Sequence, residues 1–257
     1  MNRLPYRAVI VDLDRTLLRT DKSVSGYTRE VLRDWQEAGA FLYAATARPE
    51  RAAEEYGRLL GFRSMTTLNG ARTITPAAVY ENPLDPADAF SILGQLVRTE
   101  GMIISAETEK GIRSNRDIPL WKPAVIDDIA DLPAREKIYK VLASHPEKAA
   151  DRIRIDLPGN VYCTVADGKL LQFMDRNATK WNGIRQMLAG DGLSPGEAIF
   201  FGDDNDDLEP IRKCGRGVAV RNAPDHIREA ADDIAESNDE DGVAGYLASL
   251  YSRSPLR

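Results

Sequence analysis

Short apolar runs alternate with amphipathic stretches along the first 70 residues and again after residue 175. Most of these runs are continuously apolar, as in Ala8-Val9-Ile10-Val11, which is typical of strands buried on both faces of a parallel sheet. We predict strands over residues 8–11, 41–45, 65–68, 198–201 and 218–220.

The stretches between these runs have the period of amphipathic helices. Val31, Leu32 and Trp35 lie at helical spacing behind Ser25, a candidate N-cap, and Thr179 is a candidate cap for a later helix. Further helices are predicted over residues 52–60, 181–188, 224–231 and 242–250. The alternation of strand and helix favours an α/β fold with a parallel sheet.

Between about residues 75 and 175 this alternation stops and prolines recur. Helical patches over 87–98 and 147–152 alternate there with short strands over 138–143 and 161–165. We interpret this part as an α+β module inserted into the first fold. The predicted organisation is one domain made of residues 1–78 and 176–257, interrupted by a second domain of residues 79–175.

Composition excludes several classes of protein. The 257 residues are 43% hydrophobic and 29% charged, with a formal net charge of −6, which describes a globular chain rather than a disordered one. No apolar run approaches the roughly 18 residues of a membrane helix, and the N-terminal residues lack the features of a secretory signal. Two distant cysteines offer neither a disulfide framework nor metal-ligand spacing. We expect a cytoplasmic protein with no nucleic-acid or membrane partner.

Polar side chains gather where the predicted strands end, which is where open α/β sheets bind ligands. Aspartates from two strand ends repel each other unless a cation lies between them, and Mg²⁺ is the cation that such oxygen ligands favour. A lysine and two threonine hydroxyls nearby would suit a phosphate group. The residues concerned are Asp12, Asp14, Thr16, Thr46, Lys180 and the acidic run 203–207.

Each of these residues, taken alone, has a purely structural explanation. An aspartate pair after a strand is often a turn or a helix cap, and an acidic run suits a helix N-terminus because of the helix dipole. Lys180 alone could be a surface lysine, and Thr46 an ordinary N-cap. Their common position at strand ends favours a site over these separate explanations.

Four motifs in order carry a family resemblance. They are Asp12-Leu13-Asp14-Arg15-Thr16 (D-x-D-x-T), Thr46, Lys180 and residues 202–207 (G-D-x-x-N-D). Residues 68–71, 221–224 and 238–243 add support. The chain resembles the haloacid dehalogenase superfamily and, within it, the Cof-type hydrolases with a large α/β cap. The resemblance covers nearly the whole chain and implies a Rossmann-like parallel sheet core with an inserted α+β cap domain that selects the substrate.

The resemblance implies a Mg²⁺-dependent phosphatase that hydrolyses small phosphorylated metabolites, such as sugar phosphates, through an aspartyl-phosphate. Asp12 would be the nucleophile, Asp14 the general acid and base, and Lys180 the cation that keeps Asp12 ionised. The implied metal ligands are Asp12, the backbone carbonyl of Asp14, Asp203 and Asp207. The implied phosphate-binding groups are Thr46, Thr16 and the backbone N–H groups of Leu13 and Ala47.

The sequence departs from the family pattern at two positions near these residues. Asp206 occupies a position where the family usually has asparagine, and Arg15 one where it often has glycine. Asp206, Asn205 and Arg48 are supporting candidates without an assigned role. A phosphomutase and a non-catalytic protein that binds a phosphorylated metabolite remain alternatives. The expected partner is a small phosphorylated substrate, and the chain is expected to be a monomer or a homodimer.

Overall fold

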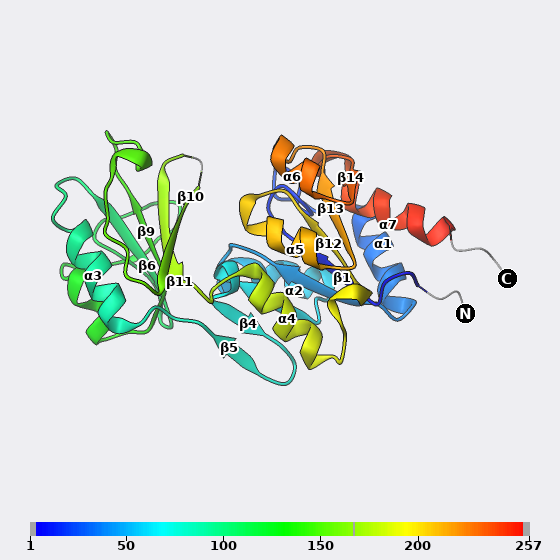
Figure 1. Ribbon diagram of the computed structural model, residues 1–257, viewed down its shortest axis with the longest axis horizontal. Coiled ribbons are helices and arrows are strands. Elements are labelled where there is room, and N and C mark those ends of the chain that lie inside the picture. Colours follow the sequence, from blue (N-terminus) through cyan, green and yellow to red (C-terminus); the bar gives the residue numbers. More distant parts are fainter. Residues whose placement is uncertain (1–3, 167, 254–257) are drawn as a thin grey trace. The chain divides into compact units, whose positions relative to one another are not determined.

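The computed structural model describes residues 4–166 and 168–253. Its contacts divide the chain into two units, one running to Tyr80 and resuming at Thr179, the other spanning Glu81–Ala178 (Figure 1). Each unit has its own sheet and its own apolar core. Within the described residues no helix is both long enough and apolar enough to cross a membrane.

An eight-stranded sheet forms the centre of the first unit, in the order β14-β13-β12-β1-β2-β3-β4-β5. The strands from β14 to β3 pair in parallel, and β4 turns back antiparallel to β3. The strands are β1 Ala8–Val11, β2 Phe41–Ala45, β3 Ser64–Thr67, β4 Arg72–Ile74, β5 Val79–Glu81, β12 Ala198–Gly202, β13 Arg216–Val220 and β14 Asp233–Ala235. The predicted α/β fold with a parallel sheet core is confirmed.

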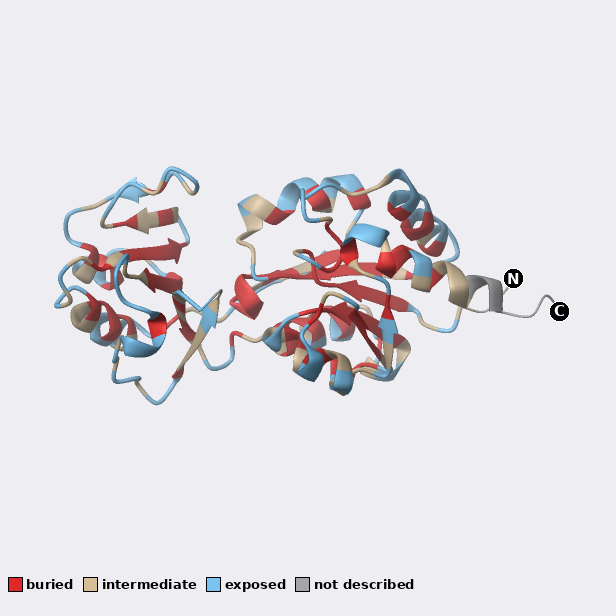
Figure 2. Cartoon of the chain, turned by 90° about the horizontal axis from the view of Figure 1, so that it is seen from above, coloured by how far each residue is buried: buried red, intermediate tan, exposed pale blue. Residues whose placement is uncertain are grey.

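Helices lie on both sides of this sheet, which is buried between them (Figure 2). Helix α1 packs against α2 and α7, while α5 packs against α4 and α6. The helices are α1 Gly26–Glu37, α2 Glu50–Leu60, α4 Lys180–Gly190, α5 Leu208–Lys213, α6 Asp225–Ala230 and α7 Gly242–Arg253. Ser25 caps α1 as predicted, because its side chain accepts a hydrogen bond from the backbone N–H of Thr28.

The second unit is a six-stranded sheet in the order β10-β11-β9-β6-β7-β8, largely antiparallel, with helix α3 packed against β9. Alternate residues of its central strands, such as Ile104 and Val141, pack with the apolar face of α3. The elements are α3 Pro86–Leu96, β6 Ile103–Thr108, β7 Gly111–Ser114, β8 Ala124–Val125, β9 Ile138–Ser144, β10 Val161–Ala166 and β11 Leu170–Asp175.

The helix predicted over residues 147–152 is wrong, since only a single 3₁₀ turn, η3 Ala150–Arg152, forms there. The ring of His145 accepts hydrogen bonds from the backbone N–H groups of Glu147 and Lys148, which fixes the chain in a turn. Six residues are also too few to offset the cost of nucleating an isolated helix.

Candidate active site

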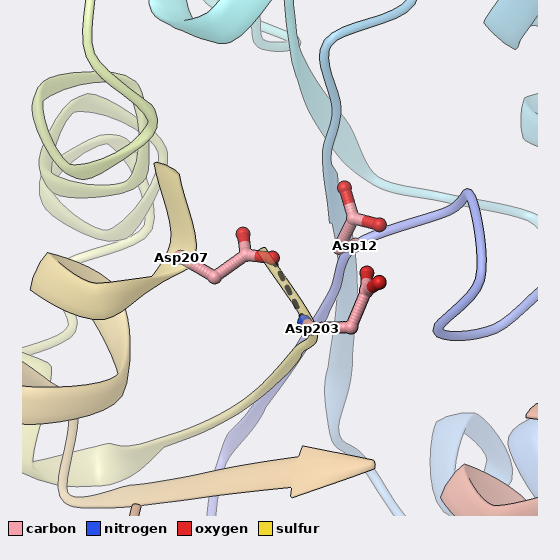
Figure 3. A group of neighbouring side chains, drawn as sticks. All are labelled: Asp12, Asp203 and Asp207. Carbon is pink, nitrogen blue, oxygen red and sulfur yellow. Dashed lines mark hydrogen bonds between the residues drawn. The ribbon is translucent and has the colours of Figure 1, made fainter. Parts of the chain in front are cut away.

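Asp12 and Asp203 lie next to each other because they follow two paired strands. Val11 is opposite Phe201 in the parallel pair β1 and β12, and the backbone N–H of Asp12 donates to the carbonyl of Phe201 at 2.9 Å. Both carboxylates therefore lie at the carboxyl edge of the sheet, Asp203 one residue further along its strand than Asp12, and both are buried. Figure 3 shows the two side chains together with that of Asp207.

Asp207 is held by the turn that follows β12. It ends the 3₁₀ turn η5 Asn205–Asp207, and its Oδ2 accepts a hydrogen bond from the backbone N–H of Asp203 at 3.0 Å (Figure 3). The same oxygen accepts a second one from the backbone N–H of Asp204 at 3.1 Å. A side chain at Gly202 would place its Cβ 2.6 Å from the Asp207 carboxyl carbon. Glycine at position 202 is therefore what allows the turn to fold back over the strand.

Lys180 joins two of the three carboxylates. It begins α4 behind the predicted cap Thr179, and its Nζ lies 2.6 Å from Asp12 Oδ1 and 2.6 Å from Asp207 Oδ1. Burial alone would lower the pKa of Lys180, but the charges of Asp12 and Asp207 outweigh it and raise that pKa above its ordinary value. The ammonium group therefore stays charged while buried.

Negative charge nevertheless exceeds positive charge in this cluster. Burial raises the pKa of Asp12 well above its ordinary value, against the opposing charge of Lys180 and with the added charges of Asp207 and Asp203. Burial and the charge of Asp207 likewise raise the pKa of Asp203 to about 6. One carboxylate oxygen from each of the three aspartates lies within 4.8 Å of the others. This arrangement can hold a metal ion, which would offset the excess charge.

The hydrogen bonds of the cluster leave specific oxygen atoms for a cation. Thr16 Oγ1 donates to Asp203 Oδ1 at 2.9 Å, and the exposed Arg15 brings its Nε within 3.7 Å of Asp203 Oδ2. Both oxygens of Asp207 accept hydrogen bonds already. Within the described part of the chain, Asp12 Oδ2 receives no hydrogen bond. Asp12 and Asp203 are therefore better placed than Asp207 to bind a cation directly.

Asp14 points its carboxylate to a different set of partners. Arg48 contacts it through two nitrogens, Nε to Oδ2 at 2.6 Å and Nη2 to Oδ1 at 2.8 Å, and Lys22 Nζ lies 2.7 Å from Oδ1. Partial burial would raise the pKa of Asp14, but the hydrogen bonds from Arg48 and Lys22 outweigh it and lower that pKa to about 2. Asp14 is thus ionised and lies outside the group of three carboxylates.

The predicted phosphate-binding groups follow β1 and β2, which are neighbouring strands. Thr46 is buried directly after β2, and its Oγ1 accepts from the backbone N–H of Arg48 at 3.1 Å, which leaves the hydroxyl proton for another acceptor. The backbone N–H groups of Leu13 and Ala47 donate to no other described residue. Thr16, by contrast, already donates to Asp203.

The remaining candidates and one unpredicted residue surround this cluster. Asn205 is exposed and its Oδ1 lies 2.7 Å from His226 Nε2, whereas Asp206 accepts a hydrogen bond from the buried Asn69. Lys22 was not predicted as a site residue, and no motif marks it, because it reaches Asp14 only through the folding of the loop between them. Asn69 lies in a stretch that the sequence had already associated with the family.

The chain is similar to known proteins over almost its full length. A family model described as haloacid dehalogenase-like hydrolase matches residues 9–247. The chain is 24% identical over 273 residues to the 5-amino-6-(5-phospho-D-ribitylamino)uracil phosphatase YitU of Bacillus subtilis (strain 168), an alignment that covers 98% of this chain and 100% of that protein.

Solved structures have the same fold. A haloacid dehalogenase-like hydrolase from Bacteroides thetaiotaomicron matches with a TM-score of 0.79 at 24% identity, covering 95% of this chain and 99% of that one. BT1666 from the same organism, described among phosphatases of the haloalkanoate enzyme superfamily, matches with a TM-score of 0.81 at 20% identity, covering 96% and 95%.

Proposed function

The chain belongs to the haloacid dehalogenase-like hydrolase family, and we propose that it is a Mg²⁺-dependent phosphatase that hydrolyses small phosphate monoesters, such as sugar phosphates, through an aspartyl-phosphate on Asp12. The observation that carries this proposal is the buried group of Asp12, Asp203 and Asp207, in which Lys180 forms ion pairs with Asp12 and Asp207. Its relatives named as phosphatases support the same activity.

Asp12 is the proposed nucleophile. One of its oxygens is bonded to Lys180, which favours the charged form of the carboxylate, and the other has no donor among the described residues and is available to attack phosphorus. The attack forms a bond between Asp12 and phosphorus and breaks the bond between phosphorus and the ester oxygen. A water molecule then attacks the same phosphorus, releases inorganic phosphate and restores the Asp12 carboxylate.

Asp14 is the proposed proton carrier in both steps. It donates a proton to the leaving alkoxide and later accepts one from the attacking water. Its contacts with Arg48 and Lys22 stabilise the ionised form, which is the form needed for the second step. For the first step the carboxyl must exchange at least one of these contacts for a proton and the leaving oxygen. A pure binding protein has no need of a second aspartate in this position.

The phosphate group is proposed to lie among donors from two strand ends. The hydroxyl of Thr46 and the backbone N–H groups of Leu13 and Ala47 are available for its oxygens, because they donate to no other described residue. Charged phosphate oxygens form stronger hydrogen bonds than neutral acceptors do. Lys180 adds a positive charge at the same edge of the sheet.

The donor set fits Mg²⁺, which prefers a small number of carboxylate oxygens together with water and phosphate oxygens. Asp12 and Asp203 would hold the ion, with the carbonyl of Asp14 as a further ligand and Asp207 acting on ion-bound water. Burial and the neighbouring carboxylates raise the pKa values of Asp12 and Asp203, so a bound cation would stabilise their ionised forms. When bound, Mg²⁺ would reduce the repulsion between Asp12 and the phosphate and stabilise charge on the transferring group.

We expect the purified protein to release phosphate from p-nitrophenyl phosphate with Mg²⁺ and to lose this activity in EDTA. Returning Mg²⁺ in excess of the chelator should restore the rate, because the ion offsets the charge of the buried carboxylates. A colorimetric assay of nitrophenol release measures both states, and a panel of phosphorylated metabolites then identifies the preferred substrate class. An unchanged rate after complete chelation would contradict the metal dependence.

A further inference from the structure

The stretch Asn238–Asp241 has no role in the chemistry above, yet it is bonded to the loop that follows the nucleophile. It forms the 3₁₀ turn η6 Asn238–Glu240 and the residue after it, just before α7. Its partners lie in residues 15–22, about 220 positions earlier in the chain. We call residues 15–22 the first-motif loop, because they continue directly from Asp14.

Two acidic side chains of this stretch hold the exposed half of the loop. Asp241 accepts two hydrogen bonds from Arg19, one from Nη2 to Oδ2 at 2.6 Å and one from Nε to Oδ1 at 3.3 Å. Asp239 accepts from the backbone N–H of Thr20 at 2.8 Å and from the Thr20 hydroxyl at 2.7 Å. A bidentate arginine contact and a paired threonine contact define orientation as well as distance.

Two asparagines hold the backbone of the other half. Asn238 Nδ2 donates to the carbonyl of Leu18 at 3.0 Å, and Asn222 Nδ2 donates to the carbonyl of Arg15 at 2.8 Å. Asn222 Oδ1 in turn accepts from the backbone N–H of Asn238 at 3.0 Å, which ties the two asparagines together. The contacts therefore hold the loop at four residues, Arg15, Leu18, Arg19 and Thr20.

The loop held in this way carries three polar side chains to the candidate site. Thr16 donates to Asp203, Arg15 lies 3.7 Å from the same carboxylate, and Lys22 lies 2.7 Å from Asp14. Arg15 and Lys22 both have positive φ angles, 61° and 69°, which residues other than glycine rarely adopt unless other contacts stabilise them. The loop conformation that aims these side chains is thus one that the chain does not favour by itself.

We propose that Asn238, Asp239 and Asp241 are positioning residues, which act on catalysis by holding the first-motif loop so that Thr16 and Lys22 orient the carboxylates of Asp203 and Asp14. This inference rests on the proposed function. None of the three contacts Asp12, Asp14 or Asp203 directly. They contact Arg19, Thr20 and Leu18 instead, so they act on the candidate site by stabilising the conformation of the first-motif loop.

The test replaces Asp241 with asparagine. Asp241 has a φ of 57°, and asparagine tolerates that left-handed conformation, so D241N keeps the backbone and an acceptor for Thr28 while it removes the charge that pairs with Arg19. R19M removes the same pair from the loop side, and R19K restores the charge without the two-pronged contact. The matched control is R7M, because Arg7 makes an ion pair with Glu197 at the opposite, amino edge of the same sheet.

We expect kcat for p-nitrophenyl phosphate to fall about 10- to 100-fold in D241N, with KM within about twofold of wild type, since a small misplacement of catalytic groups lowers the rate of chemistry rather than binding. R19M should lower kcat to a similar extent, and R19K should retain more of the wild-type kcat than R19M does. The kcat of the double variant D241N/R19M should be no lower than that of either single variant. Hydrogen exchange of the peptide that contains residues 15–22 should speed up in D241N and stay unchanged in R7M.

A wild-type kcat in D241N together with faster exchange of the loop would overturn the inference. So would an equal loss of kcat in R7M, since that result would reflect general destabilisation. A wild-type protein without phosphatase activity would instead overturn the proposed function, and this inference with it. The wild-type rate therefore separates the two failures.

Discussion

Replacing Asp12 with asparagine should abolish phosphate release while leaving the fold intact. Asparagine has the same shape but cannot form the bond to phosphorus, and loss of a nucleophile typically lowers kcat by at least about 10³-fold. Burial makes the ionised form of Asp12 costly, so removing its charge should not destabilise the protein greatly. Lys180 keeps Asp207 as a partner in the variant.

The matched control for this prediction is D204N, the same chemical change at a neighbouring position. Asp204 is exposed and serves as the N-cap of η5, a position that asparagine fills equally well. Its activity and melting temperature should stay close to wild type. If D12N kept the activity of D204N, Asp12 would not be the nucleophile.

Replacing Lys180 with methionine should affect both stability and rate. Methionine fills similar volume but leaves Asp12 and Asp207 without their shared cation, and breaking a buried ion pair from one side costs about 3–5 kcal/mol. Loss of a charge at the reacting group should in addition lower kcat about 10²- to 10³-fold. Differential scanning calorimetry and steady-state kinetics measure the two effects separately.

Mg²⁺ should raise the melting temperature of K180M more than that of the wild type, because the ion neutralises the carboxylates that the variant leaves unpaired. The control is K213M, since Lys213 makes an exposed pair with Glu209 within α5 and such pairs contribute about 0–1 kcal/mol. A melting temperature for K180M equal to that of K213M would mean that Lys180 does not offset the buried charge.

The strands of the parallel sheet and the edge that carries the candidate site could be predicted, because short local sequence patterns determine where the strands and helices form. A short, β-branched apolar run such as Ala8–Val11 is typical of a buried strand, and a cap such as Ser25 or Thr179 marks where a helix begins. Parallel strands then bring residues that follow them to one edge, so Asp12 and Asp203 meet although 190 residues separate them. The family motifs point to the same residues.

Contacts that depend on loop conformation could not be predicted in this way. Lys22 reaches Asp14 because the loop turns through two residues with positive φ, and nothing in a lysine signals such a turn. Pairing of Asp241 with Arg19 joins two polar segments that lack any apolar period. In the second unit, strands such as Leu170–Asp175 mix apolar and polar residues, so no continuous apolar run marks them, although this strand forms a hairpin with the strand directly before it in sequence.

The role of Asp12 is tested most directly by trapping the covalent intermediate. D14N should accumulate it, because nitrophenolate leaves without a proton whereas the attacking water lacks its base. The variant is mixed with p-nitrophenyl phosphate and Mg²⁺, quenched in acid and reduced with borohydride, which converts an aspartyl-phosphate to homoserine, and its peptides are analysed by mass spectrometry. We predict homoserine at position 12. A burst of nitrophenol without homoserine at that position, or with homoserine at another aspartate, would contradict the proposed mechanism.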